Sequence, residues 1–446
     1  MDHFQFSIFL FDHFQLYVSV HIILIIFYLL LYRKVNWGVF DPMFFTILNM
    51  ISSAVCVFML YNEDYLDTKY GLSFITTEVS LLIGLYLGTF MGNKVNISKL
   101  QNHKPHSEDS YSVFTTFSYI AFSIYTISEF VNIRTLGMAL FTDDSDTVTH
   151  VNIYDGHGIL MAFVTSYRLI VSFTLLYKAF VLKRKLSFID ILVGFILLIS
   201  TAMSGSKSAI FSFFFQYTIM VFPLVVKGQA KRIKLSLITI TSFIAFPLII
   251  IMTLTGTDLK TAIDLLYLRI LISGDIFLLG YNDEVMSTIQ EKSFIHYAFY
   301  PGWGTILKYM GLNVKAPEII GVDVFDYYYN VRTVGSNTGA NSRYNYIALH
   351  FFGFYGAIIY SFLIGIFIAM VRSMFKKVDY KNNSFLSYLF YAMMAFFSNL
   401  LIDDIILFSN FMFWRILFLI LTYFAAIMTV KMLKLSNYEH SEISIN

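Results

Sequence analysis

Residues 351–371 read FFGFYGAIIYSFLIGIFIAMV. This run has no charged side chain, and about 20 apolar residues are enough for a helix to cross a bilayer. The whole chain of 446 residues has the same character, since 57% of its residues are hydrophobic and 13% are charged. A soluble domain carries about 25% charged residues. The composition therefore predicts a membrane protein and excludes a cytosolic enzyme, a nucleic-acid binder and a disordered chain.

Eleven runs of this kind predict an all-α polytopic integral membrane protein made of a single membrane domain, 1–446. They lie at 12–32, 40–61, 72–92, 111–132, 157–182, 188–203, 209–226, 235–254, 351–371, 384–402 and 405–430. No Lys or Arg precedes Arg33, so the N-terminus lacks the positive region of a cleavable signal peptide and the first span is expected to be retained.

The basic residues predict the orientation. Eighteen Lys and Arg residues lie in one set of connections, at 33–34, 94–104, 183–185, 227–234, 372–381 and 431–434. The short connections on the other side contain only Lys69, Arg134 and Lys207. Because cytoplasmic loops are enriched in Lys and Arg, the N-terminus is expected outside and the C-terminus in the cytoplasm.

Two external loops are longer than the other connections, at 133–156 and 255–350. The larger one begins with a helical pattern over 258–290, which charged residues interrupt, so this run is predicted to be an interfacial or re-entrant helix. Tyr297, Phe299, Tyr300 and Trp303 follow and suit the membrane–water interface.

Two arginines fall inside predicted spans, Arg168 in the fifth and Arg415 in the eleventh. Ionisable groups in the hydrocarbon are costly and usually face a cavity or a partner. Both lie about 15 Å below the outer surface at 1.5 Å per residue, so they could line one cavity that binds an anionic lipid head group, and a pyrophosphate suits the guanidinium fork. The alternative is structural pairing with acids near the outer ends of the spans. These acids are Glu78, Glu129, Asp403 and Asp404.

Five residues in the external connections carry groups that suit a phosphate or a sugar. Lys207 lies in the turn SGSKS, 204–208, where a phosphate or sugar contact and a plain polar turn are equally consistent with the sequence. Arg269 precedes Asp275 in the helical run, and the carboxylate there could bind a sugar hydroxyl or act as a base. Arg332 and Arg343 flank VGSNTGAN, which predicts either a saccharide groove or an ordinary loop.

His350 lies where the chain enters the ninth span and could act as a base near neutral pH, although an interfacial histidine is more often inert. Cys56 is the single cysteine, so neither a disulfide framework nor a cysteine-based metal site is expected. No metal-binding constellation and no cofactor motif occur in the sequence.

The layout resembles the O-antigen polymerase family, the oligosaccharide repeat-unit polymerases of bacterial envelopes. The resemblance is carried by SGSKSAIFSF, by RILISGDIFLLGY and by NSRYNYIALHFFGFYGAIIYSFLIGIFI, together with the number of spans and the large external loop. Arg269, ten residues and Gly280 match one signature proposed for such loops. The 133–156 loop does not match it, because Ser145 stands where the glycine would be.

The resemblance implies a metal-independent membrane glycosyltransferase with a GT-C-like architecture in the bacterial inner membrane. Its substrate would be an oligosaccharide linked to undecaprenyl pyrophosphate, and a chain-length regulator would be a further partner; nucleic acid would not be one. The donor-phosphate candidates are Arg168, Arg269, Arg343 and Arg415, and the base candidates are Asp275 and His350.

Three alternatives stay open. An O-antigen ligase would share the architecture and the donor and differ in the acceptor. A flippase for lipid-linked oligosaccharides would be expected to show internal repeats, and none is visible here. A scaffold for a chain-length regulator would not need arginines at mid-membrane depth.

Overall fold

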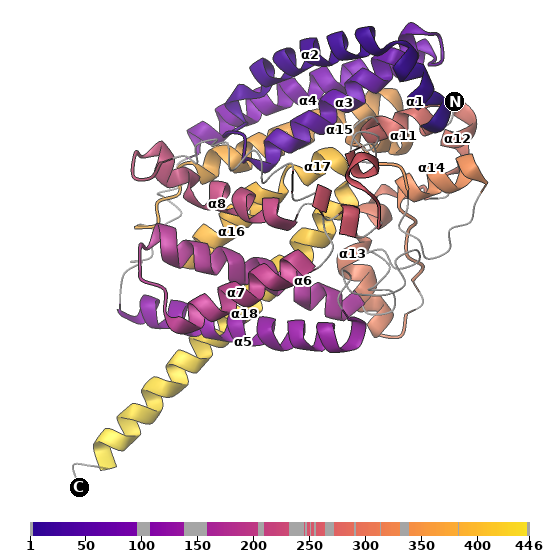
Figure 1. Cartoon of the computed structure of the whole chain (residues 1–446). Coiled ribbons are helices and arrows are strands. Elements are labelled where there is room, and N and C mark those ends of the chain that lie inside the picture. The colour runs from indigo at the N-terminus through magenta and orange to yellow at the C-terminus, as the bar shows by residue number, and fades with distance from the viewer. Residues whose placement is uncertain are drawn as a thin grey trace. The chain divides into compact units, whose positions relative to one another are not determined.

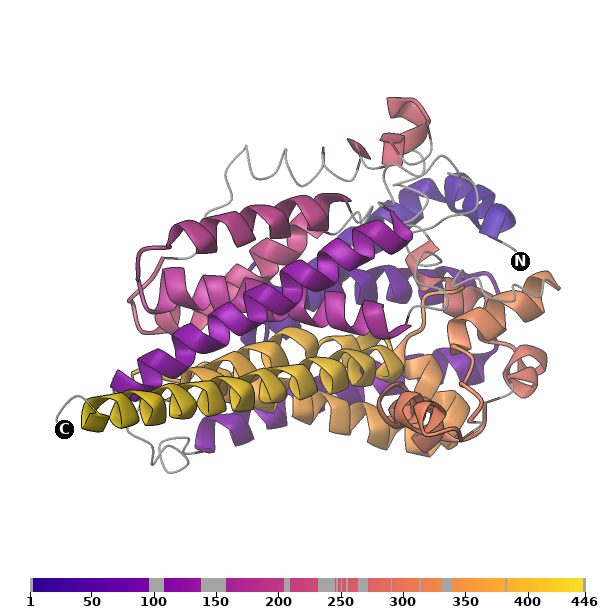
Figure 2. The ribbon, with the colours of Figure 1, turned by 90° about the horizontal axis from the view of Figure 1, so that it is seen from below.

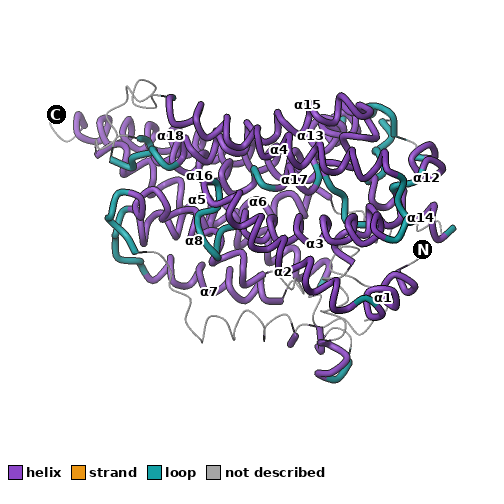
Figure 3. Tube along the Cα trace, turned by 90° about the horizontal axis from the view of Figure 1, so that it is seen from above, coloured by secondary structure: helices purple, strands orange, loops and turns teal. Residues whose placement is uncertain are grey.

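The computed structural model describes residues 3–95, 108–137, 158–203, 209–231, 245, 248–249, 251–253, 256–263, 272–289, 291–312, 314–330, 339–381 and 383–443. Throughout these residues the secondary structure is helical and no strand occurs (Figure 3). The predicted all-α class is therefore confirmed for these residues.

Seven of the described helices are long and apolar enough to cross a membrane. They span Phe14–Lys34, Pro42–Asn62, Thr68–Lys94, Gly158–Val181, Tyr344–Phe375, Phe385–Asp403 and Ile405–Lys434. Two shorter apolar helices, Phe188–Ala202 and Phe211–Val226, coincide with the sixth and seventh predicted spans. Helix α5 (Glu108–Leu136) is long but rich in Ser, Thr and Tyr. The predicted eighth span, 235–254, lies largely outside the described residues, so the total of eleven stays a prediction.

The chain divides into two compact units, which are described separately. Unit 1 comprises Met1–Val95, Ile233–Met374 and Met394–Asn410, and unit 2 comprises Asn96–Arg232, Phe375–Met393 and Phe411–Asn446. The longer helices of the N-terminal part of unit 1 are α1 (His3–Asp12), α2 (Phe14–Leu31), α3 (Pro42–Asn62) and α4 (Thr68–Lys94). Its later helices are α11 (Asp275–Gly280), α12 (Asp283–Thr288), α13 (Phe294–Tyr309), α14 (Ile320–Tyr329), α15 (Tyr344–Phe375, whose last residue falls in unit 2) and α17 (Leu400–Asp403) (Figure 1).

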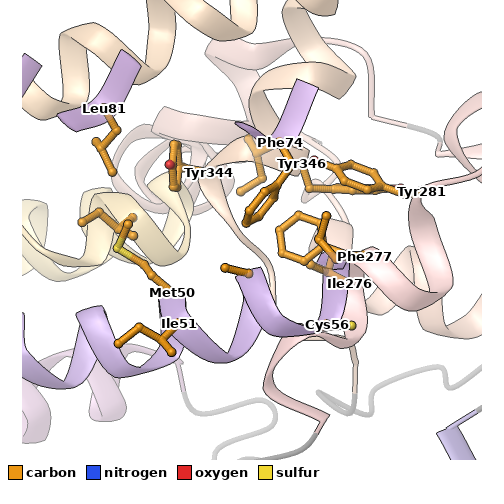
Figure 4. Packing of buried hydrophobic residues seen from close by; sticks show 14 of the residues in the cluster. Met50, Ile51, Cys56, Phe74, Leu81, Ile276, Phe277, Tyr281, Tyr344 and Tyr346 are labelled. Carbon is orange, nitrogen blue, oxygen red and sulfur yellow. The ribbon is translucent and has the colours of Figure 1, made fainter. Parts of the chain in front are cut away.

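Helix α3 forms the centre of unit 1. It begins after Asp41, whose carboxylate accepts a hydrogen bond from the Met43 amide, and Pro42 occupies the first turn, where its missing N–H costs nothing. Met50, Ile51 and Cys56 of α3 face side chains from α4, α11 and α15 in one buried cluster (Figure 4). This core supports the polar residues at the start of α15.

Glycines let α4 and α15 approach closely. A Cβ atom on Gly84 would lie 2.2 Å from the Phe362 carbonyl oxygen, and one on Gly88 would lie 2.3 Å from that of Ile366. Small residues four apart are typical of tightly packed membrane helices, because they allow backbone-to-backbone contact. Gly84 and Gly88 therefore determine where α4 packs against α15, because a side chain at either position would collide with the α15 backbone.

Helix α15 is two helical segments joined at Gly353, where φ is 65° and ψ is −173°. Only glycine adopts this conformation readily. The segment after the kink, 354–375, is about 33 Å long at 1.5 Å per residue and is enough to cross the hydrocarbon. The predicted span at 351–371 falls almost entirely on this second segment, and residues 344–352 form a separate helical segment before it.

The sequence predicts a helix over 258–290, but in the structure this run is not one continuous helix. Helices α11 and α12 are separated at Tyr281 and Asn282. The Asn282 side chain accepts hydrogen bonds from the amides of Glu284 and Val285, which starts a new helix instead of continuing the old one. Residues 264–271, including Arg269, lie outside the described residues.

Unit 2 is built around α5, α6 (Gly158–Leu176), α7 (Phe188–Met203) and α8 (Ala209–Val226), which lie against one another (Figure 2). Polar pairs join these apolar helices. The Tyr125 and Ser200 hydroxyls are 2.6 Å apart, and the Tyr167 hydroxyl is 2.9 Å from that of Thr422 on α18 (Ile405–Ile443). Helix α16 (Phe385–Phe397) begins in the same unit.

Candidate functional site: the polar turn that begins α15

Residues 341–346, NSRYNY, lie near the end of the 255–350 segment, which the sequence predicts to be external, and they include the start of α15. We call them the 341–346 turn. Five of its six side chains make a hydrogen bond to a residue distant in the sequence: Asn341 to Asp275, Arg343 to Asp403, Tyr344 and Asn345 to Glu78, and Tyr346 to Gly280. The turn is thus the point at which α3, α4, α11 and α17 are connected by polar contacts.

Arg343 is the basic centre of the turn. One terminal nitrogen pairs with Asp403, Nε donates to the Ser53 hydroxyl at 3.3 Å, and the other terminal nitrogen donates to the Ser273 carbonyl at 3.3 Å. The Arg343 side chain is 5% exposed, whereas that of Asp403 is 22% exposed. Hydrogen bonds to charged groups are stronger than neutral ones. The guanidinium is therefore held in a fixed orientation, and its acidic partner can still be reached.

Asp275 is the first residue of α11 and is buried. Its carboxylate accepts a hydrogen bond from the backbone amide nitrogen of Asn341 at 2.7 Å and another from the side-chain nitrogen of Asn341 at 3.2 Å. The Arg343 contact with Ser273 lies two residues away on the same segment. The structure therefore brings together Asp275 and Arg343, which sequence analysis had placed in separate roles.

Glu78 on α4 supports the other side of the turn. Its carboxylate accepts from the Tyr344 hydroxyl at 2.9 Å, from the Asn345 side chain at 3.1 Å and from the Tyr28 hydroxyl at 3.1 Å. Three hydrogen-bond donors around the carboxylate offset the free-energy cost of removing it from water. These contacts connect α2, α4 and α15.

At the outer edge, α12 is attached to the start of α4 by an exposed ion pair. Asp283 accepts from Lys69 at 2.5 Å and from the Tyr70 hydroxyl at 2.7 Å. The hydrogen bond from Lys69, with that from Tyr70, lowers the pKa of the Asp283 carboxyl below its ordinary value. Asp283 is therefore ionised at neutral pH, and the contact is charged.

The base candidate His350 lies outside this network. Its Nε2 is 2.8 Å from the Glu291 carbonyl oxygen. A carbonyl only accepts, so Nε2 carries the proton and Nδ1 is the nitrogen that can still accept one. His350 fastens α15 to the segment before α13 in this arrangement.

The two arginines predicted to share a cavity both belong to unit 2, and each has a protein contact. Arg168 donates to both carboxylate oxygens of Glu129, at 3.1 and 3.0 Å, which is the pairing that the sequence left as the alternative. Arg415 donates to the Phe411 carbonyl at 3.2 Å and lies over the Phe411 ring. Lys207, Arg269 and Arg332 lie outside the described residues.

The sequence pattern does not indicate Ser53, Asn341 or Asn345, and it indicates Glu78 and Asp403 only as possible pairing partners of Arg168 and Arg415. An available signal was the position of both acids within apolar runs, where a charged group needs a partner. Serines and asparagines give no such signal. Among the described residues no group of three or more His, Cys, Asp or Glu side chains could hold a metal ion.

No protein-family model, characterised protein or solved structure matches this chain.

Proposed function

We propose that this chain polymerises lipid-linked oligosaccharide repeat units at the outer face of a bacterial inner membrane. It would transfer the growing glycan from undecaprenyl pyrophosphate to the non-reducing end of a new lipid-linked repeat unit. The observation that carries the proposal is the Arg343–Asp403 pair. It is a guanidinium fixed by protein contacts beside a partly exposed carboxylate, where the external segment meets an apolar span.

The chemistry needs a cationic group for the donor and a base for the acceptor. The acceptor hydroxyl oxygen attacks the anomeric carbon of the donor glycan while the bond from that carbon to the pyrophosphate oxygen breaks. The acceptor proton passes to a carboxylate, and undecaprenyl pyrophosphate leaves. A fixed guanidinium stabilises the negative charge that develops on the leaving group.

Within this proposal Arg343 binds the pyrophosphate and Asp403 is the base. Pyrophosphate bound to Arg343 would share the guanidinium charge with Asp403, and the partly exposed Asp403 carboxylate would take the acceptor proton. Asp275 is a positioning residue, because its carboxylate holds Asn341 and thereby the start of the turn. In this assignment Asp403 takes the role of base that the sequence analysis gave to Asp275 and His350, because Asp403 is the carboxylate paired with Arg343.

The test uses full-length protein in liposomes with lipid-pyrophosphate repeat units. Wild type should produce a glycan ladder and release lipid pyrophosphate. Asp403→Asn retains the shape of the side chain, and we expect it to lower the rate about 100-fold or more, as is typical when a general base is removed. Arg343→Lys should raise the KM for the donor, because lysine cannot reproduce the planar fork. Arg184→Ala, at an exposed arginine, is the matched control.

Melting temperatures of all variants separate loss of chemistry from loss of folding. Wild-type laddering in folded Asp403→Asn and Arg343→Lys would overturn the assignment of the site. Translocation of the lipid-linked glycan without any new glycosidic bond would favour a flippase. Transfer to a lipid A core acceptor, and not to a repeat unit, would favour a ligase.

A further inference from the structure

Helix α13 carries a continuous stripe of exposed apolar side chains. Ile295 is 66% exposed, Phe299 57%, Trp303 44%, Ile306 42% and, directly after the helix, Met310 71%. Intervals of three and four residues place all five within roughly 80° of one another on a helix with 3.6 residues per turn. Single exposed hydrophobic residues are ordinary, but a stripe on one helix face indicates an interaction surface.

The opposite face of α13 is attached to the core of unit 1. Tyr297 and Ala298 are fully buried, and the Tyr297 hydroxyl donates to the Asp404 carboxylate at 2.6 Å. Ser293 accepts from the His296 amide and so begins the helix. The apolar stripe is therefore the outward face of a firmly attached helix.

The length and ends of α13 indicate how it meets a membrane. Its 16 residues measure about 24 Å at 1.5 Å per residue, which is shorter than the hydrocarbon thickness of about 30 Å. Exposed Lys292 and Lys308 lie near its two ends, where they can reach lipid phosphates. Trp303 lies mid-stripe, and tryptophan is enriched at membrane interfaces.

We infer that α13 lies in the lipid–water interface, with this stripe inserted among the acyl chains and its two lysines at the level of the head groups. An amphipathic helix with an apolar stripe and basic residues outside that stripe binds a phospholipid surface in this way. The inference goes beyond the proposed function, since it concerns a surface that the transfer reaction does not use.

The tether to Asp404 gives the insertion a consequence for the site. Asp404 follows Asp403, the partner of Arg343, and its carboxylate also accepts from the Ile406 amide at 3.0 Å at the start of α18. A helix fixed in the interface on one face and bonded to Asp404 on the other holds the 341–346 turn near the depth of the lipid head groups.

The experiment places an NBD fluorophore on single introduced cysteines in full-length protein in phospholipid nanodiscs. Phe299→Cys and Met310→Cys test the stripe, and Lys308→Cys is the matched control near the end of the same helix. The native Cys56 is buried, and wild type labelled in parallel measures any background. Quenching by doxyl-labelled phospholipid reports contact with acyl chains, and quenching by iodide reports contact with water.

We expect labels at 299 and 310 to be quenched several-fold more by doxyl lipid than the label at 308, and several-fold less by iodide. Strong iodide quenching at 299 and 310 would place the stripe in water and overturn the inference. Protection from both quenchers would mean that a protein covers the stripe, which also overturns it. The result does not depend on glycan transfer, so a failed polymerase assay leaves it intact.

Discussion

Arg168 and Glu129 form an ion pair inside the apolar helices of unit 2, with side chains 19% and 4% exposed. Removing charged groups from water is expensive, and their attraction offsets that cost only while both are present. Arg168→Met should therefore lower the free energy of unfolding by about 3–5 kcal/mol, the usual cost of leaving one buried charge unpaired. Thermal unfolding in detergent micelles measures the loss.

The double variant Arg168→Met with Glu129→Leu is the matched control, because it removes both charges and keeps apolar volume. It should recover much of the lost stability. If Arg168→Met melts like wild type but loses laddering, the arginine would belong to the donor site, as the sequence first suggested.

At this scale the sequence predicts that a residue needs a partner, but not which partner. Arg168 and Glu78 stand out in apolar runs, yet their partners, Glu129 and the 341–346 turn, are 39 and 266 residues away for the closest contacts. Arg372 shows the same limit. It counts as one of the eighteen basic residues of the connections, but its buried side chain pairs with Asp41 and lies over the Trp37 ring. Tertiary packing decides these matches.

In unit 1, α4 and α15 pack closely at glycine residues. Gly88→Ala on α4 should force the backbone of α15 to shift, since its Cβ would lie 2.3 Å from the Ile366 carbonyl oxygen. Overpacking of this kind costs about 1–3 kcal/mol. Gly194→Ala on α7 is the matched control, because its Cβ would meet only Leu175 Cδ1 at 3.7 Å. Thermal unfolding of the two variants should separate them, and equal melting temperatures would contradict close α4–α15 contact.

Element boundaries follow from the sequence where composition alone decides them. The runs at 40–61 and 405–430 predict spans that the structure places at Pro42–Asn62 and Ile405–Lys434. The prediction of one helix over 258–290 is wrong, because the Asn282 side chain accepts hydrogen bonds from nearby backbone amides and starts a new helix. Helical periodicity does not reveal this local cap. The division of α15 at Gly353 was equally hidden, since a glycine in an apolar run reads as an ordinary span residue.

For the molecule as a whole, the amino-acid composition predicts a membrane location but does not predict which reaction the protein catalyses. A 13% charged fraction places the chain in a membrane, and seven long apolar helices among the described residues agree. The candidate site depends on contacts among α3, α4, α11, α15 and α17, which come from widely separated parts of the sequence. Periodicity carries no information about such contacts, so Asp275 and Arg343 were found as residues but not as neighbours.

The distribution of charge makes one prediction about the whole chain. One set of connections contains eighteen basic residues, whereas the short connections on the other side contain three. This bias predicts that the C-terminus lies in the cytoplasm. Green fluorescent protein fused after Asn446 should therefore fluoresce, whereas alkaline phosphatase at the same position should be inactive, because it folds only outside. Phosphatase inserted after Lys315, in the large external segment, should be active. An active phosphatase at the C-terminus with an inactive one at 315 would reverse the orientation and put the Arg343 site on the cytoplasmic side.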